Sequence, residues 1–189
     1  DTSMSDSLRY PLKLADFITM PTAVDVHPQR VAWAGDPQHW IEHLPNVGMQ
    51  GDHFCSPLMV DEVFLPYATS VMYIDPSGRG KDGVGYAVVS QLHGMLIIRQ
   101  WGSLTGGYDG ATLARLAKIG FDERVNEIMV EANFGGGMYT TLFQPVVDKV
   151  WAGEYKKTKG QAALNGDGKY LDAMSNSCRV TDETVTGRR

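Results

Sequence analysis

The chain has 189 residues, 43% of them apolar and 21% charged, and a net charge of −5. This length can bury one hydrophobic core, and the mild acidity excludes a domain that binds nucleic acid by basic charge alone. A metal-loaded acidic site remains compatible with nucleic acid, because it carries its own cations. Cys55 and Cys178 are the only cysteines, which argues against a disulfide framework and a four-cysteine zinc site.

The sequence also argues against membrane insertion. No apolar run approaches the length that spans a bilayer, and residues 1–6 lack the basic and apolar regions of a signal peptide. We therefore expect a soluble, intracellular protein in a reducing compartment, with no membrane partner.

Residues 1–68 are poorly periodic. Prolines interrupt this part of the chain repeatedly, and proline is disfavoured inside helices and central strands. They lie at positions 11, 21, 28, 37, 45, 57 and 66. We expect an irregular linker or extension over 1–68, with a short helix over 37–44.

Residues 69–150 have the regular patterns of a domain core. The β-prone runs 70–75, 83–90 and 95–101 predict three strands in an antiparallel meander, with a turn at His93-Gly94. Asp109 has the residue type of a helix N-cap. The helix after it carries residues at offsets of three, four and seven on one face: Leu113, Leu116, Ala117 and Gly120.

A strand ending at Glu131 and a helix over 136–150 follow. The strand must join the sheet by a crossover, and Pro145 should kink the helix or split its first turn from the rest. The helical spacing predicts these inward residues: Leu142, Phe143, Val146, Val147 and Val150. The order of elements predicts an α/β fold with an RNase H-like mixed sheet, a three-strand meander plus a parallel strand, flanked by helices. Residues 151–189 are polar and glycine-rich and predict a divergent or truncated tail.

Two carboxylates lie at predicted strand ends. Asp75 closes the run 71–75 just before Pro76, and Glu131 closes the run 126–131 before a glycine-rich stretch. In the predicted fold these strands are neighbours, so the two acids would face each other. Two close carboxylates repel, and shared Mg²⁺ or Mn²⁺ ions with oxygen ligands would keep both ionised. Two such ions can support hydrolysis of a phosphodiester.

Each acid has a simpler alternative. The sequence of residues 75–78, Asp-Pro-Ser-Gly, is also an ordinary turn signature. Glu131 could be a loop acid that accepts hydrogen bonds from the glycines after it. The occurrence of both acids at strand ends, with the expected elements between them, favours a site.

The glycine-rich segment after Asp75 is not a P-loop. Gly80-Lys81 is followed by Asp82 instead of Ser or Thr, and Asp75 occupies the place of the first glycine. Arg79 and Lys81 could contact a nucleic-acid backbone or solvate a turn. Asp82 could add a direct or outer-sphere metal ligand, or pair with one of these cations.

Three segments resemble a known family. Residues 73–82 (YIDPSGRGKD), 85–88 (GYAV) and 131–138 (EANFGGGM) resemble the nuclease domain of the terminase large subunit of short-tailed phages. Residues 9–12 and 44–52 are similar to the segment that links the family's ATPase to its nuclease. The resemblance covers about residues 5–150.

The resemblance implies an RNase H-like endonuclease, with its core over 69–150, that cuts concatemeric double-stranded viral DNA during packaging. It implies Asp75 and Glu131 as catalytic metal ligands for a two-metal site of Mg²⁺ or Mn²⁺. The implied partners are DNA, the terminase ATPase domain, the small terminase subunit and the portal. The implied location is the host cytoplasm, transiently at the procapsid portal. The Walker motifs of the family's ATPase are absent from this sequence.

The family's third acid has no clear counterpart here. Residues 166–174 (GDGKYLDAM) faintly resemble its motif, which makes Asp167 and Asp172 weak candidates for a third metal ligand. Three hypotheses follow: a terminase-type nuclease, a terminase-like module that binds DNA or packaging proteins without cutting, and another RNase H-like nuclease such as a junction resolvase.

Overall fold

The computed structural model describes residues 20–32, 40–41, 54–77, 83–132, 137–165 and 177–183. The chain forms two compact units, residues 1–65 and 66–189. No helix of the described residues is long and apolar enough to cross a membrane.

The first unit consists of short strand pairs. Strand β1 (Val26–Pro28) pairs with β6 (Phe64–Pro66). Antiparallel pairs join β2 (Val31–Ala32) to β5 (Met59–Val60) and β3 (Trp40–Ile41) to β4 (Phe54–Cys55). The helix expected over 37–44 is therefore wrong at residues 40–41, which form a strand.

The second unit is built on a five-stranded sheet with the order β11-β10-β7-β8-β9. Strands β7 (Thr69–Asp75), β8 (Val84–Leu92) and β9 (Met95–Leu104) form an antiparallel meander. Strands β10 (Glu127–Glu131) and β11 (Arg179–Glu183) extend it in parallel. The predicted mixed sheet, with a meander and a parallel crossover strand, is confirmed.

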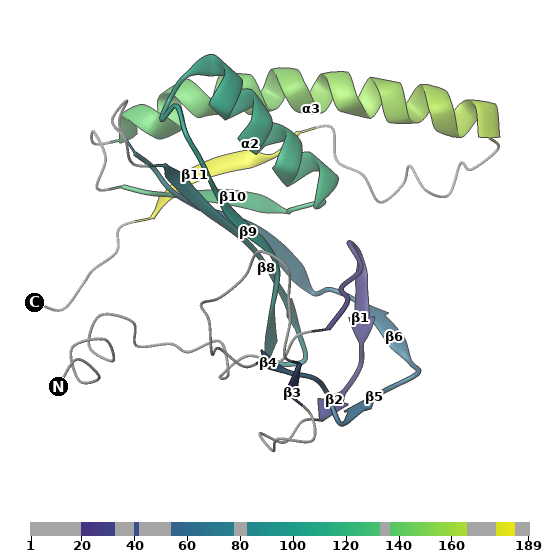
Figure 1. Ribbon diagram of the computed structural model, residues 1–189. Coiled ribbons are helices and arrows are strands. Elements are labelled where there is room, and N and C mark those ends of the chain that lie inside the picture. Colours follow the sequence, from purple (N-terminus) through teal and green to yellow (C-terminus); the bar gives the residue numbers. More distant parts are fainter. Residues whose placement is uncertain are drawn as a thin grey trace, which may run out of the picture. The chain divides into compact units, whose positions relative to one another are not determined.

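Two helices cover one face of this sheet, which we call the helix face (Figure 1). Helix α2 (Gly110–Asp122) begins after the N-cap Asp109, and all four of its predicted inward residues are buried. Helix α3 (Met138–Asn165) is one continuous helix that contains Pro145. Proline therefore does not split α3 as one expectation had it.

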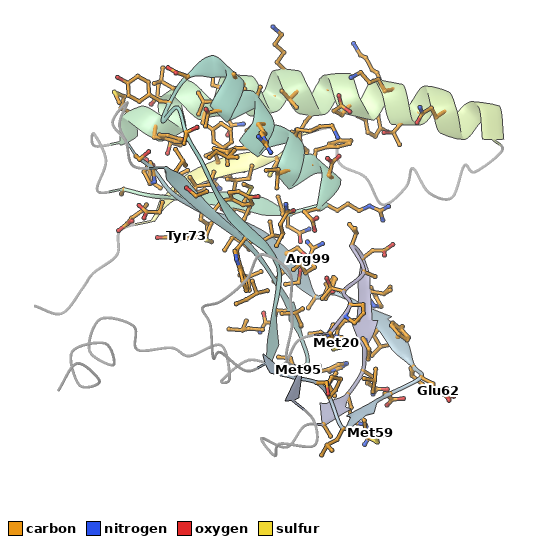
Figure 2. The ribbon with its side chains drawn as sticks, viewed as in Figure 1. Met20, Met59, Glu62, Tyr73, Met95 and Arg99 are labelled. Atoms are coloured by element: carbon orange, nitrogen blue, oxygen red, sulfur yellow. The ribbon has the colours of Figure 1, made fainter. Side chains whose placement is uncertain are left out.

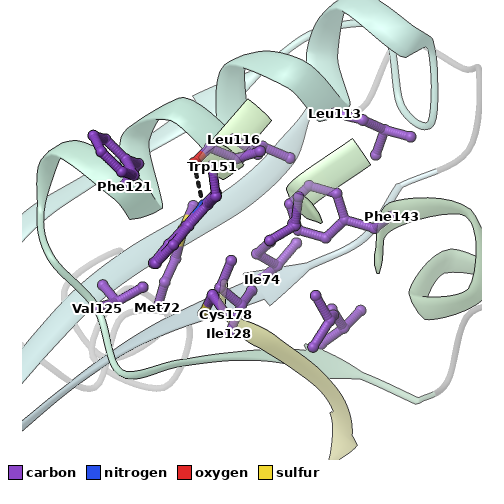
Figure 3. Packing of buried hydrophobic residues seen from close by; sticks show 14 of the residues in the cluster. Met72, Ile74, Leu113, Leu116, Phe121, Val125, Ile128, Phe143, Trp151 and Cys178 are labelled. Carbon is purple, nitrogen blue, oxygen red and sulfur yellow. Dashed lines mark hydrogen bonds between the residues drawn. The ribbon is translucent and has the colours of Figure 1, made fainter. Parts of the chain in front are cut away.

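The core lies between the helices and the sheet (Figure 3). Met72 and Ile74 of β7 and Ile128 of β10 are fully buried there, because alternate strand residues lie on the same face. Trp151 of α3 is 2% exposed, donates its indole N–H to the carbonyl of Ala117 at 3.0 Å, and packs edge-on to Phe121. The interlocked rings hold α2 against α3.

The region expected to be a polar tail contributes to this core. Helix α3 extends well past Val150, because Trp151 is buried and Tyr155 packs against the core. Strand β11 also lies in this region, and Val180 is 7% exposed. Conversely, Leu142 was expected inward but is 42% exposed, because the inward side of α3 passes through Tyr139, Phe143 and Val147.

A β-bulge in the meander gives Arg99 an unusual position (labelled in Figure 2). Val88 pairs with Gln100 and Val89 with Ile98, so Arg99 is the extra residue of β9. Its side chain is 1% exposed and forms a 2.8 Å ion pair with Glu123, the C-cap of α2. Arg99 also donates to the hydroxyl of Ser90 at 2.7 Å. The bulge thus turns a cation inward to tie the sheet to the end of α2.

Candidate metal centre

Asp75 and Glu131 lie beside each other at one edge of the sheet. Val130 pairs with Ile74 in parallel register, so the next residues, Glu131 and Asp75, are neighbours on adjacent strands. Ile74 and Val130 are buried on the helix face, and strand alternation puts both acids on the other face, which we call the acid face. Adjacent strands are about 4.8 Å apart, so the two carboxylates are within reach of one ion.

The surroundings leave room beside Asp75. Its partner across β8 is Gly85, which has no side chain, and a methyl group there would meet the Asp75 Cβ at 3.6 Å, an ordinary contact. Asp75 is exposed and Glu131 is partly exposed. Among the described residues, the position across from Asp75 on β8 therefore adds no side chain beside the carboxylate.

Strand β11 brings two further acids to this edge. Asp182 pairs with Val130, and Glu183 pairs with Glu131. Because successive strand positions lie on opposite faces, position 182 belongs to the helix face and position 183 to the acid face. The backbone thus places Asp75, Glu131 and Glu183 in one row across three neighbouring strands.

Helix α3 holds β11 through side chains of its first turns. Thr140 donates its hydroxyl to Asp182 in a short hydrogen bond. The carboxamide of Gln144 donates to the carbonyl of Cys178 at 3.0 Å and accepts from the N–H of Val180 at 2.8 Å. Since β11 is an edge strand, Gln144 satisfies backbone groups that a further strand would otherwise pair.

A buried thiol lies near the other end of β10 and β11. Cys178 is 5% exposed, and burial, followed by the negative charge of Glu127, raises the pKa of its thiol to about 12. Glu127 in turn accepts a 3.0 Å hydrogen bond from the hydroxyl of Thr181. A thiol with this pKa remains protonated near neutral pH, and thiolate is the form that binds metals. Cys178 is therefore a packing residue.

The donors at the sheet edge suit a hard divalent cation. Carboxylate oxygens are the preferred ligands of Mg²⁺ and Mn²⁺, whereas no softer donor lies in the row of strand-end acids. Within the described part of the chain, no group of three or more His, Cys, Asp or Glu residues forms a complete metal cage. Two described carboxylates fit such an ion as a partial ligand set.

The structure brings together two of the predicted site residues, Asp75 and Glu131. Asp82, Asp172, Arg79 and Lys81 lie outside the described residues, as does Asp167. Sequence reasoning overlooked Asp182 and Glu183. A usable signal was present, because the β-branched residues 180–181 precede these acids much as an apolar run precedes Asp75.

The sequence is similar to known proteins over much of its length. The family model described as Terminase Bacteriophage T7, Ribonuclease H-like domain, matches residues 74–180. Over 147 residues, 78% of this chain, the sequence is 37% identical to the terminase large subunit of Enterobacteria phage T3. That alignment covers 25% of the relative, so the chain spans about a quarter of its length.

A solved structure is also similar, although weakly. It is a mutant nuclease domain of the large terminase subunit gp2 of bacterial virus Sf6, with manganese and β-thujaplicinol. The TM-score is 0.37 and the identity 13%, over 64% of this chain and 39% of the other. A likeness of that size carries no weight for the fold or the site.

Proposed function

Because this chain belongs to the ribonuclease H-like domain family of the bacteriophage T7 terminase, we propose that it is a metal-dependent endonuclease domain. Its substrate is the phosphodiester backbone of concatemeric double-stranded viral DNA, cut during packaging. The observation that supports this proposal is the parallel pairing of Ile74 with Val130, which brings the carboxylates of Asp75 and Glu131 together.

Asp75 and Glu131 hold the divalent ions in this proposal, either Mg²⁺ or Mn²⁺. When bound, a pair of such ions supplies Lewis-acid stabilisation of the attacking and leaving oxygens of the phosphodiester. The two carboxylates would orient the ions, and Gly85 across from Asp75 adds no side chain beside them. The sheet supplies rigidity, since both acids are at the ends of hydrogen-bonded strands.

Two residues compete for the role of third carboxylate. Asp172 was the candidate from the sequence, and it lies outside the described residues. Glu183 is the register partner of Glu131 at the same edge. We favour Glu183, because its backbone position lies in the row of acids beside Glu131. Asp82 remains a candidate for an outer-sphere or direct ligand.

The partners follow from the same proposal. Arg79 and Lys81, close in sequence to Asp75, would contact DNA phosphates. Such contacts position the protein on DNA without reading the base sequence. The terminase ATPase domain, the small terminase subunit and the portal are the proposed protein partners, met in the host cytoplasm.

Plasmid nicking with Mn²⁺ or Mg²⁺ tests the activity. We expect wild-type protein to convert supercoiled plasmid to open-circular and linear forms, and EDTA to stop it. Asp75→Asn and Glu131→Gln should each reduce nicking by about 100-fold or more, while circular dichroism shows that the fold is retained. Undiminished nicking by both variants would show that other residues carry the activity.

A second candidate function is a terminase-like module that binds DNA or packaging proteins without cutting. The observation that favours it is the partial ligand set, since the described side chains provide no complete metal cage. Retained DNA binding by gel shift, together with no nicking at any Mn²⁺ concentration, would support it. Cleavage confined to four-way junctions would instead indicate a junction resolvase.

A further inference from the structure

Strand β11 contacts both β10, which ends at Glu131, and the first turn of α3. Glu131 ends β10, and Gly137 directly precedes the first residue of α3, Met138. Because β11 also pairs with β10 in parallel register, the start of α3 is coupled to the strand that carries Glu131.

Asp182 makes those contacts from the neighbouring strand. One carboxylate oxygen accepts the hydrogen bond from Thr140, and the other faces Gly137, where an added Cβ would come within 3.1 Å of it. Gly137 has φ +87°, a conformation that favours glycine. The backbone of the turn thus lies directly against the carboxylate. Asp182 is also the register partner of Val130, the residue before Glu131.

We infer that Asp182 is a positioning residue for Glu131. It acts through Thr140 and the turn at Gly137, which it ties to the strand beside Glu131, and it does not itself contact the metal. Its place in the alternation of β11 supports this separation of roles, because position 182 lies on the helix face and the acid pair lies on the other face. The inference rests on the proposed function of Asp75 and Glu131.

The alternative is a purely structural role. A carboxylate at the start of a helix interacts favourably with the helix dipole, whatever the metal site does. In that case Asp182 would affect the stability of the fold and leave the affinity for Mn²⁺ unchanged. Metal affinity therefore distinguishes the two roles, and stability alone does not.

The test uses Asp182→Ala, Thr140→Val and the double variant, with Asn126→Ala as matched control. The side-chain oxygen of Asn126 accepts hydrogen bonds from the N–H of Ser70 at 2.7 Å and the hydroxyl of Thr69 at 3.5 Å. The control therefore breaks contacts just before β10, at the end of the strand opposite to Glu131. Mn²⁺ affinity is measured by electron paramagnetic resonance of free Mn²⁺. The Mn²⁺ concentration for half-maximal nicking and the melting temperature are measured alongside.

We expect Asp182→Ala and Thr140→Val each to weaken Mn²⁺ binding by about 10- to 100-fold, as the loss of outer-shell partners commonly does. The double variant should be no weaker than Asp182→Ala, because both changes break the same contact. Asn126→Ala should lower the melting temperature and keep the wild-type Mn²⁺ affinity.

Three results would overturn the inference. If Asp182→Ala weakens Mn²⁺ binding and Thr140→Val does not, Asp182 acts as a ligand and not through the helix. If neither variant differs from the control, the contact is structural only. If the wild type binds no Mn²⁺ and makes no nicks, the proposed function fails and the inference falls with it. Wild-type binding that Glu131→Gln removes separates that last case from the first two.

Discussion

Glu131 stands next to Asp75 because Val130 of β10 pairs in parallel with Ile74 of β7. The two acids are 56 positions apart in the numbered sequence, and the crossover through α2 brings them to the same edge. A slip of one residue in this register would turn one of them to the opposite face. The pairing is therefore the structural condition for a shared metal ion.

Asp75→Asn and Glu131→Gln should each reduce plasmid nicking by about 100-fold or more, the scale of loss from a misplaced reacting group. Each substitution keeps the side-chain volume and removes the charge that a divalent ion needs. The rate is measured over a range of Mn²⁺ concentrations, because a weakened site should respond partly to excess metal.

Asp122→Asn is the matched control for these two variants. Asp122 is an exposed acid at the end of α2 that forms an ion pair with Lys118. Its loss changes the net charge equally and should leave nicking within about twofold of wild type, since an exposed pair contributes little. An equal fall in all three variants would point to net charge and not to a metal site.

The third carboxylate can be identified by comparing Glu183→Gln with Asp172→Asn. We expect Glu183→Gln to weaken Mn²⁺ binding more, because Glu183 is the register partner of Glu131. Isothermal titration with Mn²⁺ measures both variants under the same conditions. A larger loss for Asp172→Asn would assign the role to Asp172 and refute the choice of Glu183.

Arg99→Met should destabilise the second unit by about 3 kcal/mol, because charged hydrogen bonds to Glu123 and Ser90 are lost from a buried position. Methionine roughly preserves the apolar volume of the side chain, so the loss reports mainly on the polar contacts. Urea unfolding followed by tryptophan fluorescence measures it. A change below about 1 kcal/mol would show that Arg99 is dispensable for the bulge.

Stability should fall at alkaline pH partly through Cys178. Burial and the charge of Glu127 raise the pKa of its thiol from 9.0 to about 12 in the folded protein. Below pH 9 the Cys178 thiol is protonated in both the folded and the unfolded chain. The stability that comes from its raised pKa is therefore fully present there. As pH rises from about 9 towards 12 the unfolded chain loses the proton first, which favours unfolding.

Cys178→Ala removes this dependence. As pH rises from 7 to 10.5, we expect the urea midpoint of unfolding to fall further for the wild type than for Cys178→Ala. Parallel midpoints over this range would contradict the raised pKa of Cys178.

Two glycines of the α3 region make a contrasting pair. Gly137→Ala should destabilise the protein by about 1–2 kcal/mol, because φ is +87° and Asp182 lies 3.1 Å from the new Cβ. Gly153→Ala should stabilise it by about 0.5–1 kcal/mol, since this helix position is open. Thermal unfolding of both variants checks the opposite signs, and a shift in the same direction would contradict the description of the turn.

The sequence by itself determined the local elements of the second unit. The alternation of residues 70–75 and the turn at His93-Gly94 specify the meander from neighbouring residues alone. His93 and Gly94 both have a positive φ, as a tight turn requires. The helical spacing of Leu113, Leu116 and Ala117 likewise predicted the buried side of α2. Such signals suffice because these elements depend on short-range backbone preferences and on the placement of one apolar face. They were also enough to identify Asp75 and Glu131 as strand-end acids.

Only the tertiary structure decided how these elements meet. Strand β11 has five residues and little apolar content, and it exists because β10 and Gln144 satisfy its backbone. Arg99 is buried because a β-bulge turns it inward and Glu123 forms an ion pair with it. No sequence pattern within β9 predicts this. Asp182 and Glu183 reach the edge of the acid pair through parallel register with β10. These outcomes depend on contacts between residues far apart in sequence. A short segment read by itself does not reveal such contacts.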